Sequence, residues 1–206
     1  MRLATALTRH LPTTARFGAV GAVLATRLAV GPLLGETTGP AAITPDNLAT
    51  GSAAVAQAAP SSTQLSPVPV TADQSHIPLS AEQQHNAQQI VHATKSMNLP
   101  PRAAVIAVAT SMQETKLHNY GHLGTHNDHD SLGLFQQRPS SGWGTPEQIT
   151  DPQHATTSFL TGLQQVPGWQ QMPLTDAAQK VQVSAYGDRY AQWETQAADI
   201  VHDTYK

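Results

Sequence analysis

The aromatic residues of this chain are distributed very unevenly along its 206 residues. Phe17 is the only Phe, Trp or Tyr before Tyr120. A segment that has almost no large rings and few charges cannot bury enough apolar surface to offset the conformational entropy lost on folding. We therefore expect residues 35–80 to be disordered, and we expect a single domain to occupy the C-terminal part of the chain.

The composition excludes several kinds of partner and site. The formal net charge is −3, and the 11 Lys and Arg residues are scattered, so no basic stripe is present to neutralise a phosphate backbone. We therefore expect no nucleic-acid partner. The absence of cysteine excludes disulfides, thiolate nucleophiles, cysteine-based zinc sites and a lipid-modified N-terminal cysteine.

The N-terminal 35 residues have the order of a secretory signal. Arg2, Arg9 and Arg16 precede an apolar run at residues 17–34, and the first acidic residue is Glu36. A membrane-spanning helix is the alternative, but Arg27 lies within the run, and an arginine near the bilayer centre costs about 2.5–3.5 kcal/mol. We expect residues 1–35 to be a signal peptide or a membrane leader of an exported protein. An unstructured arginine-rich leader remains the other interpretation.

Residues 36–79 are rich in Ala, Pro, Ser and Thr, a composition typical of a disordered linker. Such a tether would suit an enzyme that reaches into a polymer mesh outside the membrane. A segment without a function of its own would have the same composition, so both interpretations stay open.

The expected domain, residues 80–206, begins with a helix. Ser80-Ala81-Glu82-Gln83 has the form of a capping box, and apolar residues follow it at helical spacing. Leu99-Pro100-Pro101 ends this helix and begins a second one, because proline is tolerated in a first helical turn.

Residues 103–109 are apolar on every face of that second helix, which predicts that it is buried at the centre of the domain. Farther along, Asp151-Pro152 is typical of a helix start, Thr175 is expected to cap another helix, and residues 190–205 carry the apolar stripe of a last one. Because no segment alternates apolar and polar residues as a strand does, the expected fold class is all-α.

Glu114 is the first candidate catalytic residue, since it lies near the C-terminal end of the apolar helix. Burial and the partial negative charge of a helix C-terminus both disfavour a carboxylate and therefore raise its pKa. A carboxylic acid that is still protonated near neutral pH can donate a proton to a leaving oxygen. An exposed glutamate that pairs with Lys116 or a histidine is the alternative.

Several motifs follow one another in a characteristic order. They are Gln113-Glu114-Thr115-Lys116-Leu117, Asp130-Ser131-Leu132-Gly133-Leu134-Phe135-Gln136-Gln137, Asp151-Pro152 and Ala185-Tyr186-Gly187. In order and approximate spacing they resemble the catalytic domain of the soluble lytic transglycosylases and goose-type lysozymes, within the lysozyme-like superfamily. The pattern from Asn127 to Pro146 is similar to that of exported actinobacterial wall proteins of this group. The resemblance covers roughly residues 81–205.

The resemblance implies a lysozyme-like helical domain that cleaves peptidoglycan and needs no cofactor. Glu114 would protonate the glycosidic oxygen between N-acetylmuramic acid and N-acetylglucosamine. The turn from Gly133 to Gln137 would line the cleft, with Gln136 positioning the substrate, and Tyr186 could hydrogen-bond Glu114. Thr115, Phe135 and Gly187 depart from the Ser, Met and Asn that the family usually has at these places.

The mechanism depends on whether a second carboxylate is present. Hydrolysis by two acids needs a base or nucleophile across the scissile bond, whereas a transglycosylase lets the 6-hydroxyl of the sugar attack. Asp128 and Asp130 are the nearby candidates, and Asp151 is better interpreted as a helix cap. Loop aspartates are usually solvated or bind the local backbone, so hydrolase and transglycosylase both stay open.

His118, His122, His126 and His129 share the loop with these aspartates, which raises the question of a metal site. Their spacing does not match the helical zinc pair of an H-E-x-x-H motif, so we expect a polar surface loop and no metal. Two alternatives to an enzyme remain: a catalytically silent wall-binding module of the same fold, and a metal-binding envelope protein that uses this loop.

Trp143 lies between Gly142 and Gly144 in a second loop. An exposed ring there could stack on sugars, and a buried one would anchor the loop to the core. We keep Trp143 as a candidate substrate-binding residue together with Gly133, Gln136, Gln137 and Tyr186.

Overall fold

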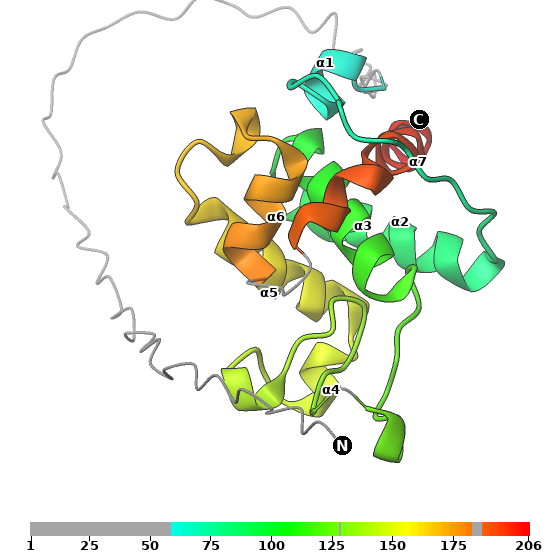
Figure 1. Ribbon diagram of the computed structural model, residues 1–206, viewed down its shortest axis with the longest axis vertical. Helices are drawn as coiled ribbons and strands as arrows, with labels where there is room; N and C mark the ends of the chain where they lie inside the picture. The colour runs from blue at the N-terminus through cyan, green and yellow to red at the C-terminus, as the bar shows by residue number, and fades with distance from the viewer. Residues whose placement is uncertain (1–58, 128, 183–186) are drawn as a thin grey trace, which may run out of the picture. The chain divides into compact units, whose positions relative to one another are not determined.

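The computed structural model describes residues 59–127, 129–182 and 187–206. These residues fold into helices and loops, with two isolated β-bridges and no strand (Figure 1). The longer helices are α2 (Ala81–Ser96), α3 (Pro101–Thr115), α5 (Pro152–Gln164), α6 (Leu174–Gln182) and α7 (Glu194–Tyr205). The shorter helices are α1 (Ser62–Leu65) and α4 (Pro146–Ile149), and the 3₁₀ turns are η1 (Gly124–His126), η2 (Pro139–Ser141), η3 (Trp169–Gln171) and η4 (Gly187–Trp193). The expected all-α class is confirmed for this part of the chain.

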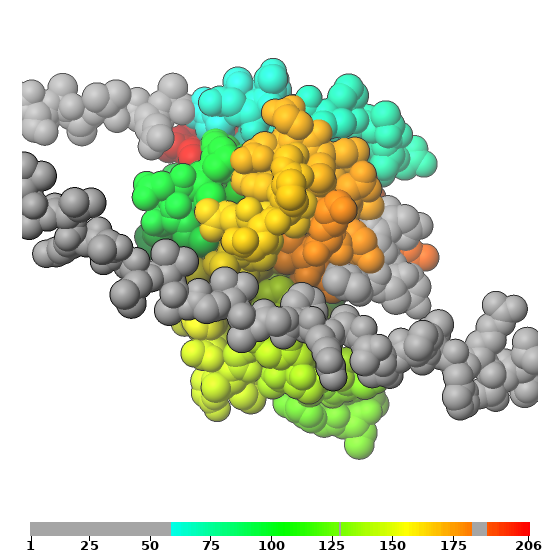
Figure 2. Space-filling view, turned by 90° about the vertical axis from the view of Figure 1, so that its left-hand side faces the viewer, coloured from blue at the N-terminus to red at the C-terminus, as the bar shows by residue number. Residues whose placement is uncertain are grey.

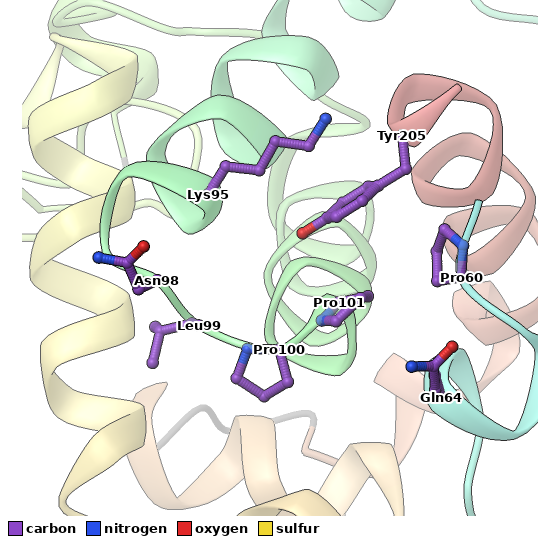
Figure 3. A pocket seen from close by; sticks show the side chains of 8 residues that line it. All are labelled: Pro60, Gln64, Lys95, Asn98, Leu99, Pro100, Pro101 and Tyr205. Atoms are coloured by element: carbon purple, nitrogen blue, oxygen red, sulfur yellow. The ribbon is translucent and has the colours of Figure 1, made fainter. Parts of the chain in front are cut away.

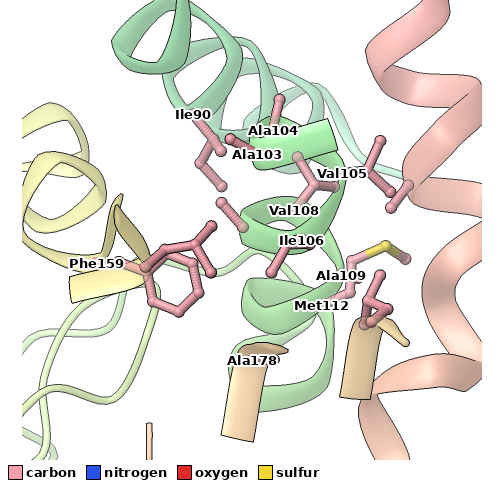
Figure 4. Close-up of a cluster of buried hydrophobic side chains, with 14 of the residues drawn as sticks. Ile90, Ala103, Ala104, Val105, Ile106, Val108, Ala109, Met112, Phe159 and Ala178 are labelled. Carbon is pink, nitrogen blue, oxygen red and sulfur yellow. The ribbon is translucent and has the colours of Figure 1, made fainter. Parts of the chain in front are cut away.

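Helix α3 is the centre of the domain, as its apolar sequence predicts. Every residue from Ala103 to Ala109 is fully buried. Figure 4 shows Ile90 of α2, Phe159 of α5 and Ala178 of α6 among the side chains around it. Burying one large aliphatic or aromatic side chain stabilises a fold by about 1.5–3 kcal/mol, so this cluster fixes the position of α3.

The helix starts agree with the sequence in two cases and differ in a third. Ser80 forms the expected capping box with Gln83, and the Asp151 carboxylate accepts a hydrogen bond from the His154 N–H. Helix α6 begins at Leu174, so the expectation that Thr175 caps it is wrong. Thr175 Oγ1 instead accepts a hydrogen bond of 3.0 Å from the Ala191 N–H of η4.

The expected disorder of the linker is wrong for residues 59–79. Helix α1 places Leu65 in the core with only 4% of its surface exposed, and Ile77 and Leu79 pack against the same cluster. Hydrogen bonds to the domain also hold this segment, since the Arg102 side chain donates to the Leu65 carbonyl. A few aliphatic side chains with such bonds replace the large rings that the sequence lacks here. Residues 1–58, which include the expected leader, lie outside the described part.

Arg102 and Glu194 form a buried ion pair between the first turn of α3 and the first turn of α7. Arg102 also donates to the Met172 carbonyl. Removing one partner of such a pair leaves an uncompensated buried charge, so the pair holds the N-terminal ends of the two helices together.

The connection from α3 to α5, residues 116–127 and 129–151, lies at the C-terminal end of α3 and is called the lobe here (Figure 1). Figure 2 shows its yellow-green atoms below helices α5 and α6. This lobe carries most of the polar motifs found in the sequence. None of the helices in the described residues is long and apolar enough to cross a membrane.

Candidate active site

Glu114 lies in the last turn of α3, one residue before the helix ends at Thr115. Its side chain is half-buried. Burial raises the pKa of its carboxyl above the usual value, because a low-polarity environment disfavours the charged form. This is the direction that the sequence predicts for Glu114.

Tyr190 is the hydrogen-bond partner of Glu114. Its phenol is in η4, is fully buried, and donates to Oε1 of Glu114 over 2.6 Å. This bond stabilises the carboxylate and lowers the pKa of Glu114, as do a hydrogen bond from Gln182 and the charge of Lys116. Burial outweighs the three together, so the net direction is upward.

Gln182, the last residue of α6, connects Glu114 to the turn that follows it in sequence. Besides its bond to the Glu114 carboxylate, its amide Nε2 donates to the carbonyl of Phe135 over 2.7 Å. The acid and the Gly133–Gln137 turn are therefore held by one side chain.

Thr115 makes a second connection to the same turn. Its hydroxyl is buried and lies within hydrogen-bonding distance of two carbonyl oxygens, Ser111 O at 3.1 Å and Leu134 O at 3.0 Å. The Thr115 hydroxyl, next to Glu114, thus connects the end of α3 to the turn.

The turn itself is a short hairpin in which Leu132 and Gln137 exchange two backbone hydrogen bonds. Gly133 has φ +72°, and its N–H donates to the Tyr120 carbonyl over 2.7 Å. A Cβ at this position would lie 2.2 Å from the Ile149 carbonyl oxygen. Glycine is therefore required by the close approach of α4, independently of any sugar.

The two glutamines of the turn have different surroundings. Gln136 is half-buried with φ +50°, and its amide donates to the Gly133 carbonyl over 3.3 Å. Gln137 is only 2% exposed and donates to the Ala155 carbonyl of α5. Burial favours a structural role for Gln137 over the expected sugar contact, while Gln136 stays a candidate.

Asp130 is held in the loop as an ion pair. Its Oδ1 accepts from Arg138 Nε at 2.6 Å and from the Ser140 hydroxyl, and its Oδ2 accepts from the Ser140 N–H at 2.8 Å. These partners lower the pKa of Asp130 well below its usual range. Both oxygens are thus used to fix η2, which favours the structural interpretation over a catalytic one. Asp128 lies outside the described residues.

Lys116 follows the acid in the left-handed region, with φ 54°. Its ammonium group lies 4.7 Å from the centre of the Trp193 ring. Burial lowers the pKa of Lys116, while the nearby charge of Glu114 raises it. From the sequence, Lys116 is expected only as a partner of Glu114, and the structure adds its contact with the Trp193 ring.

The remaining candidates are only partly described. Trp143 is half-buried in the lobe, and its backbone N–H donates to the Arg138 carbonyl over 3.5 Å. Tyr186, expected to bind Glu114, lies outside the described residues, and Tyr190 four positions later makes that bond. The sequence placed Tyr190 in an apolar stripe, and nothing in the pattern distinguished its hydroxyl from that of a core tyrosine.

The histidine loop has local contacts. His118 packs against Tyr120 and lies 3.5 Å from the Glu82 carboxylate, and the His122 ring accepts from the Gly124 N–H. Among the described residues, no three His, Asp or Glu side chains are grouped closely enough to hold a metal ion.

A cavity of about 620 Å³ lies away from Glu114, where the α2–α3 connection faces α7 and residues 60–64 (Figure 3). The Lys95 ammonium covers the Tyr205 ring at 4.1 Å, and Pro60 and Pro100 line the cavity near it. None of the candidate active-site residues lines it.

The sequence matches no protein-family model, and no curated protein matches it either. The functional assignment therefore depends on the surroundings of Glu114 and on the order of the motifs around it.

Proposed function

We propose that the protein is a peptidoglycan-cleaving glycosidase with a lysozyme-like domain, in which Glu114 is the general acid. The observation that carries the proposal is the bond from Tyr190 to a half-buried carboxyl whose pKa is raised. A general acid is most effective when its pKa lies near the working pH. At Glu114, burial moves the pKa upward and three polar neighbours limit the rise.

The reaction requires Glu114 in both of its protonation states. Protonated Glu114 gives its proton to the glycosidic oxygen as the bond from that oxygen to the anomeric carbon breaks. The carboxylate that remains is stabilised by the Tyr190 hydroxyl, by Gln182 and by the charge of Lys116. It can then accept the proton of the hydroxyl that attacks the anomeric carbon.

Among the residues that the structure describes, the surroundings of Asp130 support a reaction with a single carboxyl group. Because Arg138 and Ser140 occupy both of its oxygens, Asp130 is poorly suited to activate a water molecule. We therefore favour transglycosylation, in which the 6-hydroxyl of the muramic acid attacks and an anhydro end forms, over hydrolysis.

Export and wall association complete the proposal. The N-terminal leader would take the protein out of the cytoplasm, and the Ala- and Pro-rich tether would let the domain reach glycan strands. Gln136 and Trp143 are the proposed sugar contacts, and no cofactor or metal is needed.

The test compares the release of soluble fragments from insoluble peptidoglycan by the full chain and by two variants. Glu114→Gln removes the proposed acid with almost no change in shape. Glu147→Gln makes the same chemical change at an exposed glutamate of α4 and serves as the control. We expect release by the wild type and by Glu147→Gln, with a loss of at least about 100-fold in Glu114→Gln. Equal release by all three proteins would contradict the assignment.

Binding to peptidoglycan without release of fragments would indicate the alternative function, a catalytically silent wall-binding module. If the wild type and Glu114→Gln both sediment with peptidoglycan and neither releases fragments, the protein is a wall-binding module. That result would also contradict the proposed chemistry.

A further inference from the structure

Residues 72–77, named here the strap, lie in the segment whose composition is that of a spacer. In the structure they run alongside η4 and the start of α7. Three of the six, Gln74, Ser75 and Ile77, make hydrogen bonds to residues more than 115 positions away in the sequence. A flexible spacer would not form several specific hydrogen bonds to distant parts of the domain. The strap is therefore a part of the folded domain.

Gln74 uses both atoms of its amide. Nε2 donates to the Ala191 carbonyl of η4 over 2.8 Å, and Oε1 accepts from the Thr195 N–H in the first turn of α7 over 2.8 Å. The residue before α7, Trp193, provides no side-chain cap. Because the first N–H groups of a helix have no partner within the helix, Gln74 supplies the missing cap from another segment.

Ser75 connects the strap to the residue next to the acid. Its N–H donates to the Gln192 carbonyl, and its hydroxyl donates to the Gln192 side chain over 3.0 Å. Gln192 Nε2 in turn donates to Oε1 of Gln113 over 2.9 Å. Trp193 Nε1 donates to the same oxygen over 2.9 Å, so the end of η4 is fixed against α3 beside Glu114.

Ile77 closes the strap with a reciprocal pair of bonds. Its N–H donates to the Gln196 side chain over 3.0 Å, and the amide of Gln196 donates back to the Ile77 carbonyl over 2.7 Å. Gln196 is only 4% exposed, so these bonds are shielded from water. The strap is thus anchored at both of its ends.

The segment that the strap binds begins directly after Tyr190. Residues 191 and 192 bind the strap, and Tyr190 directly before them binds Glu114. Ala191 is also held through its N–H, which donates to Thr175 of α6. We propose that the strap is a positioning element of the active site, and that Gln74 and Ser75 hold η4 so that the Tyr190 hydroxyl stays on Glu114.

The catalytic part of this inference rests on the proposed function, whereas the positioning part does not. Within the described part of the chain, the titratable and charged groups that act on Glu114 are Tyr190 from η4 and Lys116 from the end of α3. The Tyr190 bond stabilises the Glu114 carboxylate, so loosening η4 should raise the pKa of Glu114. Lys116 is unaffected, because it lies in the same chain segment as Glu114. The titration of Glu114 therefore reports on the strap even if the protein cleaves nothing.

The experiment uses the full chain with Gln74→Ala, Ser75→Ala and the two combined, each also placed in a Tyr190→Phe background. Asp73→Asn, an exposed position of the same strap, is the matched control. Peptidoglycan release is measured for every protein. The Glu114 carboxyl is titrated by NMR with ¹³C-labelled glutamate, and its signal is assigned by its absence from Glu114→Gln. Circular dichroism verifies folding, and Ser75→Ala, which loses a single side-chain bond, covers the case in which the combined variant unfolds.

We expect the combined variant to release fragments about fivefold more slowly, which corresponds to the loss of about one hydrogen bond. We also expect the pKa of Glu114 to rise. In the Tyr190→Phe background the same changes should have less than about a twofold effect, because the bond they support is already gone. Asp73→Asn should resemble the wild type.

Equal losses in both backgrounds, or an unchanged Glu114 titration in the strap variants, would overturn the inference and leave the strap a purely structural element. A pKa shift that Tyr190→Phe abolishes supports the inference even without any release of fragments. In that case the proposed function fails and the positioning role stands.

Discussion

The phenol oxygen of Tyr190 lies 2.6 Å from Oε1 of Glu114, and this bond joins residues that are 76 positions apart in the chain. Tyr190 is fully buried and Glu114 is half-buried, so the bond lies at the edge of the core. Hydrogen bonds to a charged group in such surroundings are stronger than those between neutral groups. The bond holds Glu114 against η4 and limits the rise in its pKa that burial causes.

Tyr190→Phe should raise the pKa of Glu114, because it removes the hydrogen bond that most stabilises the carboxylate. A general acid acts in its protonated form, so activity is lost as the pH rises through its pKa. We expect the alkaline limb of the pH profile for fragment release to move to higher pH, and the free energy of unfolding to fall by about 1.5–3 kcal/mol.

Tyr205→Phe is the control for that prediction, since Tyr205 is half-buried beside the distant cavity. It should leave the pH profile in place. An alkaline limb that stays at the same pH in Tyr190→Phe would show that Tyr190 does not act on the acid.

Glu114→Gln should make the protein more stable at neutral pH. The pKa of Glu114 is higher in the folded state than in the unfolded chain, so the folded state binds this proton more tightly. The stability that the protonated Glu114 carboxyl contributes is complete below its pKa in the unfolded chain. It is lost as the pH rises through its pKa in the folded state. Thermal unfolding should show a gain over the wild type at neutral pH.

That gain should shrink or vanish at about pH 4, near the ordinary value for a glutamate carboxyl. Glu147→Gln is a control of opposite sign, because hydrogen bonds with its own N–H and with Thr145 lower the pKa of this exposed glutamate. This variant should show no gain in stability at neutral pH. A Glu114→Gln variant with the same difference from the wild type at both pH values would mean that burial does not perturb this carboxyl.

Thr115→Val should destabilise the domain by about 1–3 kcal/mol, because it leaves the Leu134 carbonyl without the hydroxyl that binds it. Thr110→Val is the matched control. Both threonines are buried on α3 and bind a carbonyl one turn earlier, and only Thr115 also binds outside the helix. Chemical denaturation of the two variants should show the larger loss for Thr115, and equal losses would refute the proposed tie to the turn.

Gly133→Ala should be much more damaging than Gly142→Ala. Both glycines have positive φ, which costs another residue about 1–2 kcal/mol. Only Gly133 also faces a backbone atom, the Ile149 carbonyl oxygen, whereas a Cβ at Gly142 meets nothing within 4 Å. We expect about 1–3 kcal/mol of additional destabilisation at Gly133 in chemical denaturation. Similar losses at both sites would mean that the hairpin can move away from α4.

Much of the helical framework is predictable from the sequence because it depends on local signals. The Ser80 capping box, the Asp151 cap and the apolar run of α3 each act within a few residues. The position of Glu114 at the end of α3 follows from the same pattern, as does the direction of its pKa.

The contacts that complete the site are not predictable in this way, because they join distant segments. Tyr190 resembles any core tyrosine until η4 is placed against α3. Gln74 and Ser75 lie in a sequence of spacer composition, and their bonds depend on polar side chains that carry no periodic signal. Gln137 shows the opposite case, since a motif suggested a surface role and the fold buries it.

The mass spectrum of the fragments released from insoluble peptidoglycan tests the central role of Glu114 most directly. Wild type, Glu114→Gln and Asp130→Asn would be compared at equal concentration of folded protein. We predict anhydro-ended fragments, lighter by one water than hydrolysis products, from the wild type and Asp130→Asn, and almost none from Glu114→Gln. Undiminished release by Glu114→Gln would contradict the assignment of Glu114 as the acid.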